Sequence, residues 1–400
     1  MLNDTAPPVD TIELLLREIH ERLRRRAERP RPRRAGAAAV AALALAAFAG
    51  CAEPPPPAAA RASRAEPDAA MAPDPAPDDP CADCADASVP PATVVYVDHD
   101  HACRNEPHDA SEADPYCEIA PALPPVGAVT VQLAPSDVLY DAFFLDGAAP
   151  RDVTILGPDP TKVSIGAVDG DAIALSATQG NLVRLTASGV TLLGGKLGSA
   201  VSCAAKSAMG VVSLAGVRLR DSGFQGLVAT GCDVSLVRSV VRGNALGGVL
   251  LVETTYALGY DFVDGNGSVG IDLAASSGSL AHLTVTANRG RAAGGLRCDA
   301  GNAIVDSILV GNDSDSAIGT DVEVDPRCLV DNSALGKNAS RGLACTPWLV
   351  APDDPHLSTS TASARTHNRG CAIDHAMSSD VDIDGQAPIG LGDLGADEAG

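Results

Sequence analysis

Apolar and polar positions alternate in a phrase that is repeated five times in residues 212–325. The first four copies have apolar residues at alternate positions, then Ser or Asn, then Gly and a second apolar run, and a fifth copy keeps Ile304, Leu309 and Asn312. Equivalent residues are 22, 22, 22 and 24 positions apart, as in the series Ser222, Asn244, Asn266, Asn288 and Asn312. This nearly fixed spacing predicts a solenoid, in which each repeat packs on its neighbours.

Two solenoid architectures share the first half of the phrase, because a leucine-rich repeat opens in the same way. The second halves, residues 226–229, 248–251 and 270–273, favour strands, since an alternating run follows the Gly in place of a helical return. The pattern therefore predicts a coil whose turns stack as parallel sheets, with a leucine-rich repeat as the alternative. We expect the Asn series at a tight corner, because Asn tolerates left-handed backbone and stacked amides can bond to one another.

The chain resembles the bacterial right-handed parallel β-helix proteins, the pectin-lyase-like superfamily in its broad sense. The resemblance is carried by short apolar runs near the start and an acidic, glycine-rich motif near the end, in residues 95–98, 115–119, 129–135, 153–157, 190–195, 382–385 and 392–398. The last two segments are similar to the terminal motif of choice-of-anchor Q domains. The resemblance implies an all-β, single-stranded parallel β-helix over residues 93–345, closed by an irregular segment over residues 346–400.

One departure from the family concerns the cap that opens such helices, which usually contains a helix. Pro121, Pro124 and Pro125 interrupt the corresponding segment here. Because proline cannot sit inside a regular helix, we expect the opening cap to be a loop.

The first 50 residues have the pattern of an export signal. An Arg-rich run over residues 22–34 precedes an apolar stretch over residues 35–50, which is shorter than the roughly 20 residues that a spanning helix needs. The boundary Phe48, Ala49, Gly50 and Cys51 resembles a bacterial lipobox. This implies lipidation of Cys51, membrane anchoring through the lipid and a place in the bacterial cell envelope or surface, with an uncut signal anchor as the alternative.

Residues 51–92 are rich in Pro, Ala and Asp, a composition that favours extended, disordered chain, so we expect a tether between the lipid and the folded part. Without residues 1–50 the chain has 20 basic and 45 acidic residues, a net charge of −25. Charge of this sign predicts solubility and excludes nucleic acid as a partner.

Eleven cysteines fit an exported protein. Apart from Cys51 they form local couples, which are Cys81 with Cys84, Cys103 with Cys117, Cys203 with Cys232, Cys298 with Cys328, and Cys345 with Cys371. Spacing does not fix connectivity, but an oxidising compartment favours disulfides within loops and between nearby coils. Cys81 and Cys84 also match a redox C-x-x-C, although no βαβ context surrounds them.

Two clusters contain residue types that bind metals. His99, His101 and His108 lie close together in sequence among Asp residues, so zinc or another divalent ion is one interpretation and a solvated loop is the other. Residues Asp380, Asp382 and Asp384 match the first half of a calcium loop. Leu391 stands where that loop requires Glu, so an acidic closing turn is favoured over calcium.

A column of polar residues appears when the repeats are stacked. Arg238, Tyr260, His282 and Asp306 follow the buried Leu positions by two residues, and Arg220, Arg242, Asp264 and Thr286 form a second column. Enzymes with the resembled fold place catalytic Arg, Asp and His on such an exposed sheet face, where Arg or His would act as base. The alternative is an ordinary solvated face.

The favoured function is therefore a surface β-helix protein with a structural, adhesive or glycan-binding role and no evident catalytic site, whose partner is a polysaccharide or another surface protein. A polysaccharide lyase or glycoside hydrolase is the alternative. Aromatic residues are only 3% of the chain, which argues against a cleft that stacks on sugar rings. No cofactor is expected unless calcium binds.

Overall fold

A computed structural model describes the main part of the chain, all of it within residues 86–400. The described residues are 93–178, 180–206, 209–291, 293–298, 302–314, 324–325, 327–335, 349–351, 354–357, 363 and 368. The expected export segment and tether lie outside these residues, as do Cys51, Cys345, Cys371, Asp380, Asp382 and Asp384.

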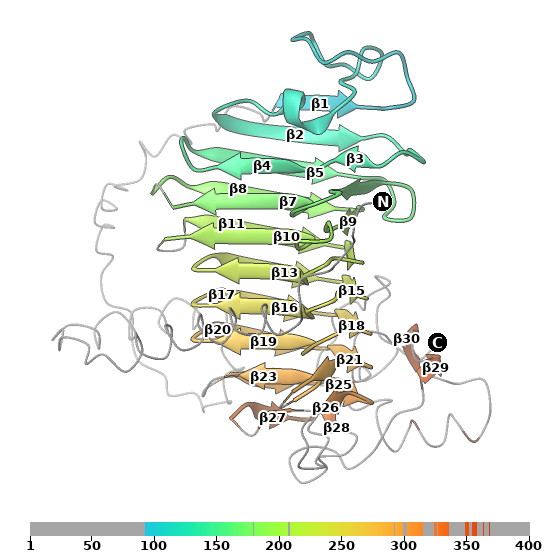
Figure 1. Ribbon diagram of the computed structural model, residues 1–400, viewed down its shortest axis with the longest axis vertical. Helices are drawn as coiled ribbons and strands as arrows, with labels where there is room; N and C mark the ends of the chain where they lie inside the picture. Colours follow the sequence, from blue (N-terminus) through green and yellow to red (C-terminus); the bar gives the residue numbers. More distant parts are fainter. Residues whose placement is uncertain are drawn as a thin grey trace, which may run out of the picture. The chain divides into compact units, whose positions relative to one another are not determined.

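Three parallel sheets, here named A, B and C, form the described structure (Figure 1). Sheet A contains β1 (Thr93–Val97), β2 (Gly127–Leu133), β5 (Arg151–Leu156), β8 (Val183–Ser188), β11 (Gly210–Ala215), β14 (Asp233–Val237), β17 (Thr255–Gly259), β20 (Ser277–Ala281), β24 (Ala303–Val305) and β27 (Leu329–Asp331). Sheet B contains β3 (Tyr140–Asp141), β6 (Ser164–Gly166), β9 (Thr191–Leu193), β12 (Arg218–Arg220), β15 (Val240–Arg242), β18 (Phe262–Asp264), β21 (Thr284–Thr286), β25 (Ile308–Val310) and β28 (Ala334–Leu335). Sheet C contains β4 (Phe143–Asp146), β7 (Ile173–Ala177), β10 (Val201–Ala205), β13 (Gln225–Thr230), β16 (Gly247–Val252), β19 (Ile271–Ala274) and β23 (Leu296–Cys298).

From β2 to β23 each turn of the chain contributes one strand to each sheet, so the predicted all-β, parallel β-helix is confirmed. Two small sheets complete the description: β22 (Arg289–Gly290) pairs with β26 (Asp313–Ser314), and β29 (Leu349–Ala351) pairs antiparallel with β30 (Asp354–Leu357). The leucine-rich alternative is excluded because each repeat supplies three strands and no helix between residues 210 and 291.

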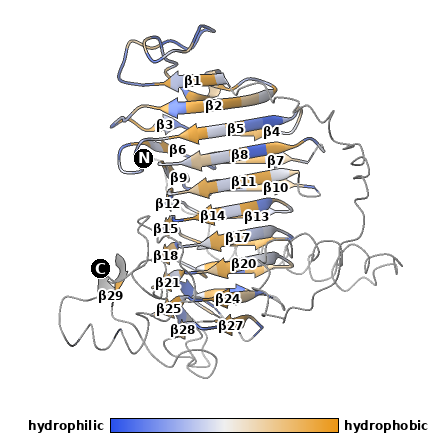
Figure 2. Cartoon of the chain, turned by 180° about the vertical axis from the view of Figure 1, so that it is seen from behind, coloured by the Kyte–Doolittle hydropathy of each residue, from blue (hydrophilic) through white to orange (hydrophobic). Residues whose placement is uncertain are grey.

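The core lies between the three sheets and is built from the alternating apolar residues. In sheet A the buried Leu214 aligns with Leu236, and in sheet B the buried Leu219 aligns with Val241 and Val263. Apolar residues recur along the strands of the stack in Figure 2. A turn therefore buries its side chains against one another and against those of the turns above and below, as in other solenoids.

The corner between sheets B and C carries an amide ladder inside the structure. The Nδ2 of Asn244 donates to the Oδ1 of Asn266 at 2.9 Å, Asn266 donates likewise to Asn288 at 2.7 Å, and Asn288 to Asn312 at 3.0 Å. Each Oδ1 also accepts the main-chain N–H of the preceding member, for example that of Asn244 on Asn266 at 3.1 Å. All four Asn side chains are buried.

The expectation that these Asn residues adopt left-handed backbone was wrong. The positive φ angles belong to the residues just before them, Asp221 (56°), Gly243 (66°), Gly265 (60°), Ala287 (53°) and Gly311 (69°). The left-handed residue turns the chain, and the following Asn can then direct its amide along the stack. Glycine suits the turning position because it has no Cβ to clash at positive φ.

The other two corners use the same pair of positions, which the sequence analysis did not recognise. Between sheets A and B, left-handed Arg238 precedes Ser239, whose N–H donates to the Oδ1 of Asp261 one turn later at 2.9 Å. Between sheets C and A, left-handed Glu253 precedes Thr254, whose N–H donates to the Oγ of Ser276 at 3.1 Å. Each of the three kinds of corner thus has at least one turn in which a left-handed residue precedes a residue whose N–H donates to a side-chain oxygen of the following turn.

Three disulfides join cysteines that the sequence had coupled: Cys103–Cys117, Cys203–Cys232 and Cys298–Cys328. Because Cys203 lies in β10 and Cys232 lies just after β13, this bond ties neighbouring turns together. Disulfides persist in oxidising compartments, so they indicate an extracellular protein.

A cap protects the outer edge of β1, the first strand of sheet A. The N–H of Tyr96 donates to the oxygen of Ala110 at 3.0 Å, and the N–H of Tyr116 donates to the oxygen of Tyr96 at 2.9 Å. These bonds block the strand edge against pairing with another chain. The cap also contains α3 (Ile119–Ala122), a correction to the expected loop, since Pro121 is tolerated in the first turn of so short a helix. Within the described ranges, no helix combines the length and hydropathy that crossing a membrane requires.

We predict that Asn266→Ala strongly destabilises the stack. The change removes the acceptor of the Asn244 N–H and the donor to the Val241 carbonyl, which both lie in buried surroundings. Buried polar groups without partners cost about 1–3 kcal/mol each, so a loss of roughly 2–5 kcal/mol is expected in urea unfolding followed by circular dichroism. Thr255→Ala, at an exposed position on β17, is the control and should change stability by less than about 0.5 kcal/mol.

A second prediction concerns Asp261, the charged member of the corner between sheets A and B. Burial raises the pKa of its carboxyl well above the ordinary value of 3.8, opposed by N–H bonds from Ser239 and Gly259. The folded state therefore holds this proton more tightly than the unfolded state, and the contribution of Asp261 to stability falls as pH rises above about 4.

Asp261→Ser keeps an acceptor oxygen and introduces the residue found at 239, the preceding position of the same corner. The melting temperature of the variant, relative to that of the unchanged chain, should rise between pH 4 and pH 7, because only the unchanged chain has the buried carboxyl group. An equal difference at both pH values would contradict the assigned cause.

Candidate functional site

The polar column predicted from the sequence lies at the corner between sheets A and B, and not on an outward strand face. Arg238, Tyr260, His282 and Asp306 all have left-handed backbone, with φ angles of 51°, 58°, 53° and 48°. They follow the last residues of their sheet A strands, so they are the turning residues of successive corners. The expectation of an exposed sheet face was wrong because strands in sheet A end one residue before this column.

The column continues in a residue that the sequence analysis missed. Asn332, with a φ angle of 40°, follows Asp306 after 26 residues and donates from Nδ2 to the Oδ1 of Asp306 at 2.5 Å. The signal was present, because Asn332 precedes Ser333 as Asp306 precedes Ser307 and Arg238 precedes Ser239. Because this step is 26 residues long and the earlier steps are 22 or 24, the alignment of Asn332 with the column was not apparent.

Side chains of the column contact one another along the stack. The rings of Tyr260 and His282 are parallel, with centroids 4.6 Å apart, and the Nε2 of His282 lies 3.9 Å from the Oδ2 of Asp306. The side chains of His282 and Asp306 are only 7% and 10% exposed, whereas Arg238 and Tyr260 are half-buried. A carboxylate beside an imidazole can orient it for proton transfer, but little of this pair reaches the surface.

Bulky residues at these turning positions are costly. A non-glycine residue with left-handed backbone costs roughly 1–2 kcal/mol, and the corner between sheets B and C uses glycine at three of five equivalent positions. Strain of this kind is found where a side chain is needed for packing or function. The contacts among Tyr260, His282 and Asp306 offset part of the cost of their left-handed backbone.

The second predicted column lies on sheet B, at the last position of its strands. Arg220 and Arg242 are exposed, and each contacts a carboxylate: Arg220 that of Asp221 at 2.6 Å, and Arg242 that of Asp264 at 3.4 Å. Asp264 and Thr286, in the following turns, are buried. Only the first half of this column is therefore accessible.

A shallow hollow of about 630 Å³ adjoins Arg220 at the corner between sheets B and C. Its charged lining residues are Lys196 and Asp221, and much of the remaining wall is glycine backbone. A Cβ on Gly223 would lie 1.9 Å from the oxygen of Lys196, so these glycines are needed to stack the turns closely. The hollow contains no aromatic lining residue and offers hydrogen-bonding groups and charge to a ligand.

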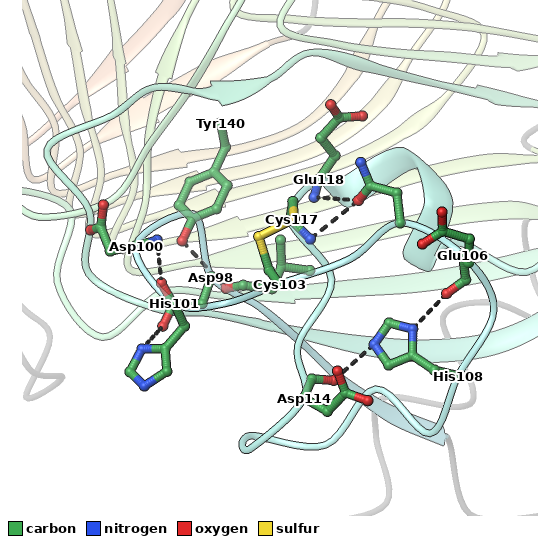
Figure 3. The surroundings of a disulfide bond; sticks show 12 residues. Asp98, Asp100, His101, Cys103, Glu106, His108, Asp114, Cys117, Glu118 and Tyr140 are labelled. Carbon is green, nitrogen blue, oxygen red and sulfur yellow. Dashed lines mark hydrogen bonds and ion pairs between the residues drawn. A yellow bond between two sulfur atoms is a disulfide. The ribbon is translucent and has the colours of Figure 1, made fainter.

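The three histidines proposed as metal ligands have different partners and do not converge. Figure 3 shows His101 beside Asp98 and His108 between Glu106 and Asp114. His99 stacks on Tyr140 with ring centroids 4.5 Å apart, and His101 pairs with Asp98 at 3.2 Å. Both ring nitrogens of His108 lie near main-chain oxygens, those of Glu106 at 2.6 Å and Asp114 at 2.8 Å. In the part of the chain that the structure describes, no three His, Cys, Asp or Glu side chains are arranged to hold a metal ion.

His108 instead helps to hold the cap loop. Besides His108, the loop is held by the Cys103–Cys117 disulfide and by the Oδ1 of Asn105, which accepts the N–H groups of Cys117 and Glu118 at 3.2 Å. The hydroxyl of buried Tyr140 donates to the oxygen of Ala134 at 2.9 Å, and burial raises the pKa of Tyr140 to about 12. Calcium binding by Asp380, Asp382 and Asp384 stays a prediction.

Comparisons with known proteins add little. No protein-family model matches the chain, and no curated protein matches it. Among solved structures, the crystal structure of the pectate lyase Pel9A is similar, with 12% sequence identity, a TM-score of 0.33, and coverage of 77% of this chain and 96% of that chain. These comparisons assign no family to the chain.

We predict that His108→Ala loosens the cap locally. The change removes the contacts with the Glu106 and Asp114 carbonyl oxygens, which tie the loop that covers the β1 edge. Hydrogen exchange at the Tyr96 and Tyr116 amides should rise by about tenfold, while the melting temperature of the stack stays unchanged. His101→Ala, at a side chain 70% exposed, is the matched control and should leave both amides protected.

Proposed function

We propose that this protein is an exported β-helix protein of the bacterial cell surface, anchored by lipid at Cys51, with a structural, adhesive or glycan-binding role. The three disulfides support export because they require an oxidising compartment. The sequence of residues 22–51 supports the lipid anchor, and the net charge of the chain, −22, supports a soluble surface domain.

The observation that carries the non-enzymatic proposal is the burial of the best catalytic pair. A polymer chain cannot reach both His282 and Asp306 when their side chains are 7% and 10% exposed. The same stack is bonded through side chains at all three corners, which suits a scaffold. A polysaccharide or partner protein would instead contact the accessible part of sheet B, where Arg220 and Arg242 adjoin the shallow hollow.

A polysaccharide lyase or glycoside hydrolase is the second candidate function. It is favoured by the contact between His282 and Asp306, by the parallel stacking of Tyr260 on His282, and by left-handed backbone at all three positions. In this mechanism His282 would act as base, Asp306 would orient its ring, and Arg238 would bind an acidic group of the substrate. This candidate function requires that a polysaccharide can reach His282 and Asp306.

The deciding experiment measures binding and turnover of uronate-containing and neutral polysaccharides by the purified full chain. The surface-protein proposal predicts no cleavage products, and binding that falls several-fold in the double variant Arg220→Ala with Arg242→Ala. If the affinity of this double variant were unchanged, Arg220 and Arg242 would not contribute to binding, and their assignment to the binding surface would be contradicted.

A second double variant, Arg238→Ala with His282→Ala, tests the enzyme. Cleavage that is present in the unchanged chain and lost in this variant would replace the surface-protein proposal by the enzyme. The matched control is Arg184→Ala with His101→Ala, which changes the same residue types at exposed positions and should leave either activity intact.

A further inference from the structure

The outward face of sheet C, which faces the viewer in Figure 1, carries no charged side chain on four successive strands. On β7, β10, β13 and β16 the residue that follows each core residue is Ala, Ser, Thr, Val or Leu. In the same turns, sheet A has Arg184 and Asp233 at outward positions, and sheet B has Arg220 and Arg242. Sheet C is therefore the uncharged side of this part of the stack, in a chain whose net charge is −22.

The outward residues of sheet C lie in columns because the strands are in register. Phe144 on β4 aligns with Ala174, Ser202, Val228 and Leu250 on the four strands that follow. Each of these residues lies between two core positions, so its side chain points away from the core. Phe144 is 57% exposed and the others are partly exposed. The column is therefore an accessible surface.

Side-chain size divides this face into a low half and a raised half. The outward residues of β7 and β10 are small, namely Ala174, Ser176, Ser202 and Ala204. Those of β13 and β16 are larger, namely Val228, Thr230, Leu250 and Val252. Each half is two strands wide, and the boundary between them lies between β10 and β13.

We infer that this face binds a second copy of the same chain, with the two helix axes antiparallel. A two-fold axis along the strands, between β10 and β13, places β10 of each copy opposite β13 of the other and β7 opposite β16. The low half of one copy then receives the raised half of its partner, so that Ala174 lies against the partner's Leu250. Such an interface is isologous, because one surface serves both copies.

The division by size excludes the parallel arrangement of two copies. A parallel pair would place Leu250 against the partner's Leu250 and Ala174 against the partner's Ala174. Two large side chains would then hold the faces apart at one end and leave a gap at the other, and a gap loses packing contacts. Only the antiparallel pair brings both halves together.

The charged groups at the rim of the face do not oppose this contact. The same two-fold axis places Phe144 opposite the partner's β19, where Ala274 and Asp272 point outward. Each carboxylate at the rim has a partner within its own chain: Asp272 bonds to Arg297, Asp146 pairs with Arg151, and Asp171 accepts from the Ser202 hydroxyl. The interface thus has an uncharged centre and a paired polar rim, as protein interfaces commonly do.

The chemistry of the face favours a copy of the chain over a charged polymer. A polyanion or a polycation would find no charge to bind at Val228, Leu250 and Val252, and apolar surface is best buried by apolar surface. Two copies also repel each other through their net negative charge, and contact through an uncharged face avoids adding to this repulsion.

The area of the face sets the strength of the dimer. Six strands spaced about 4.8 Å apart, each with about five residues of 3.3 Å, present roughly 500 Å² per copy. The total of roughly 1,000 Å² is at the lower limit for a specific interface, so we expect a reversible dimer. Its dissociation constant should be on the order of 10 μM and should fall as salt screens the repulsion between the copies.

Sedimentation equilibrium of the purified full chain tests the inference, over concentrations centred on about 10 μM. The dimer fraction should rise with concentration and with added NaCl. Val228→Glu, which puts like charges close to the two-fold axis, should weaken the dimer at least tenfold. The matched control is Val211→Glu, the same change at a partly exposed outward position on sheet A, which should leave the dimer intact. A monomer at every concentration, a dimer that dissociates as salt is raised, or equal effects of the two variants would overturn the inference.

Cross-linking tests the antiparallel arrangement without a charged substitution. Ala174→Cys and Leu250→Cys are prepared as separate chains and treated with bismaleimidoethane, which can join thiols on two packed sheets about 10 Å apart. The mixture should give dimers whose linked peptides contain positions 174 and 250, and each variant alone should give no more dimer than the unsubstituted chain. Links of 174 to 174 or of 250 to 250, or a mixture without links, would overturn the arrangement.

Discussion

The constraint on which this structure depends is the hydrogen bonding of backbone at the corners. Within a sheet every N–H finds a carbonyl on the next strand, but a chain that turns three times per repeat leaves these ladders at each corner while staying partly buried. A left-handed residue followed by an oxygen-bearing side chain solves the problem at all three corners, as at Gly243–Asn244, Arg238–Ser239 and Glu253–Thr254. The side-chain oxygen replaces the missing strand carbonyl.

The side chains at the three corners differ in how many backbone groups they satisfy and in whether they bury a charge. Asn satisfies the most groups, because one amide both accepts and donates. Asn266 accepts the N–H of Asn244 and donates to the oxygen of Val241 and to the Oδ1 of Asn288. Ser satisfies one N–H, and Asp261 satisfies two but places a carboxyl group in surroundings that disfavour its charge. The long unbroken Asn series explains why the corner between sheets B and C is the one visible as a motif in the sequence.

The sequence predicted the fold because the repeat length and the alternation of apolar and polar residues can both be read from the order of the residues. It predicted the amide ladder for the same reason, but it placed the left-handed angle on Asn244 and its equivalents, when Gly243 and its equivalents carry it. The column at Arg238 was misplaced because strands of sheet A are only three to six residues long near it, so counting by two passes beyond the strand into the corner. The repeat spacing shows which residues stack on one another. Whether such a residue lies on a strand face or at a corner depends on where each strand ends, which the spacing does not show.

The burial of Phe262 and Ile308 was beyond sequence reasoning for a different reason. Both are apolar residues at outward positions of sheet B strands, which alternation alone treats as chance exceptions. Sheet B is therefore divided: its outward residues are buried at Phe262 and Ile308, whereas Arg220 and Arg242 are exposed to solvent. Arg220 and Arg242 are each paired with a carboxylate in this accessible part, next to Asp221 and Gly243, which line the hollow. The low exposure of His282 follows from its place at a corner rather than on an outward strand face.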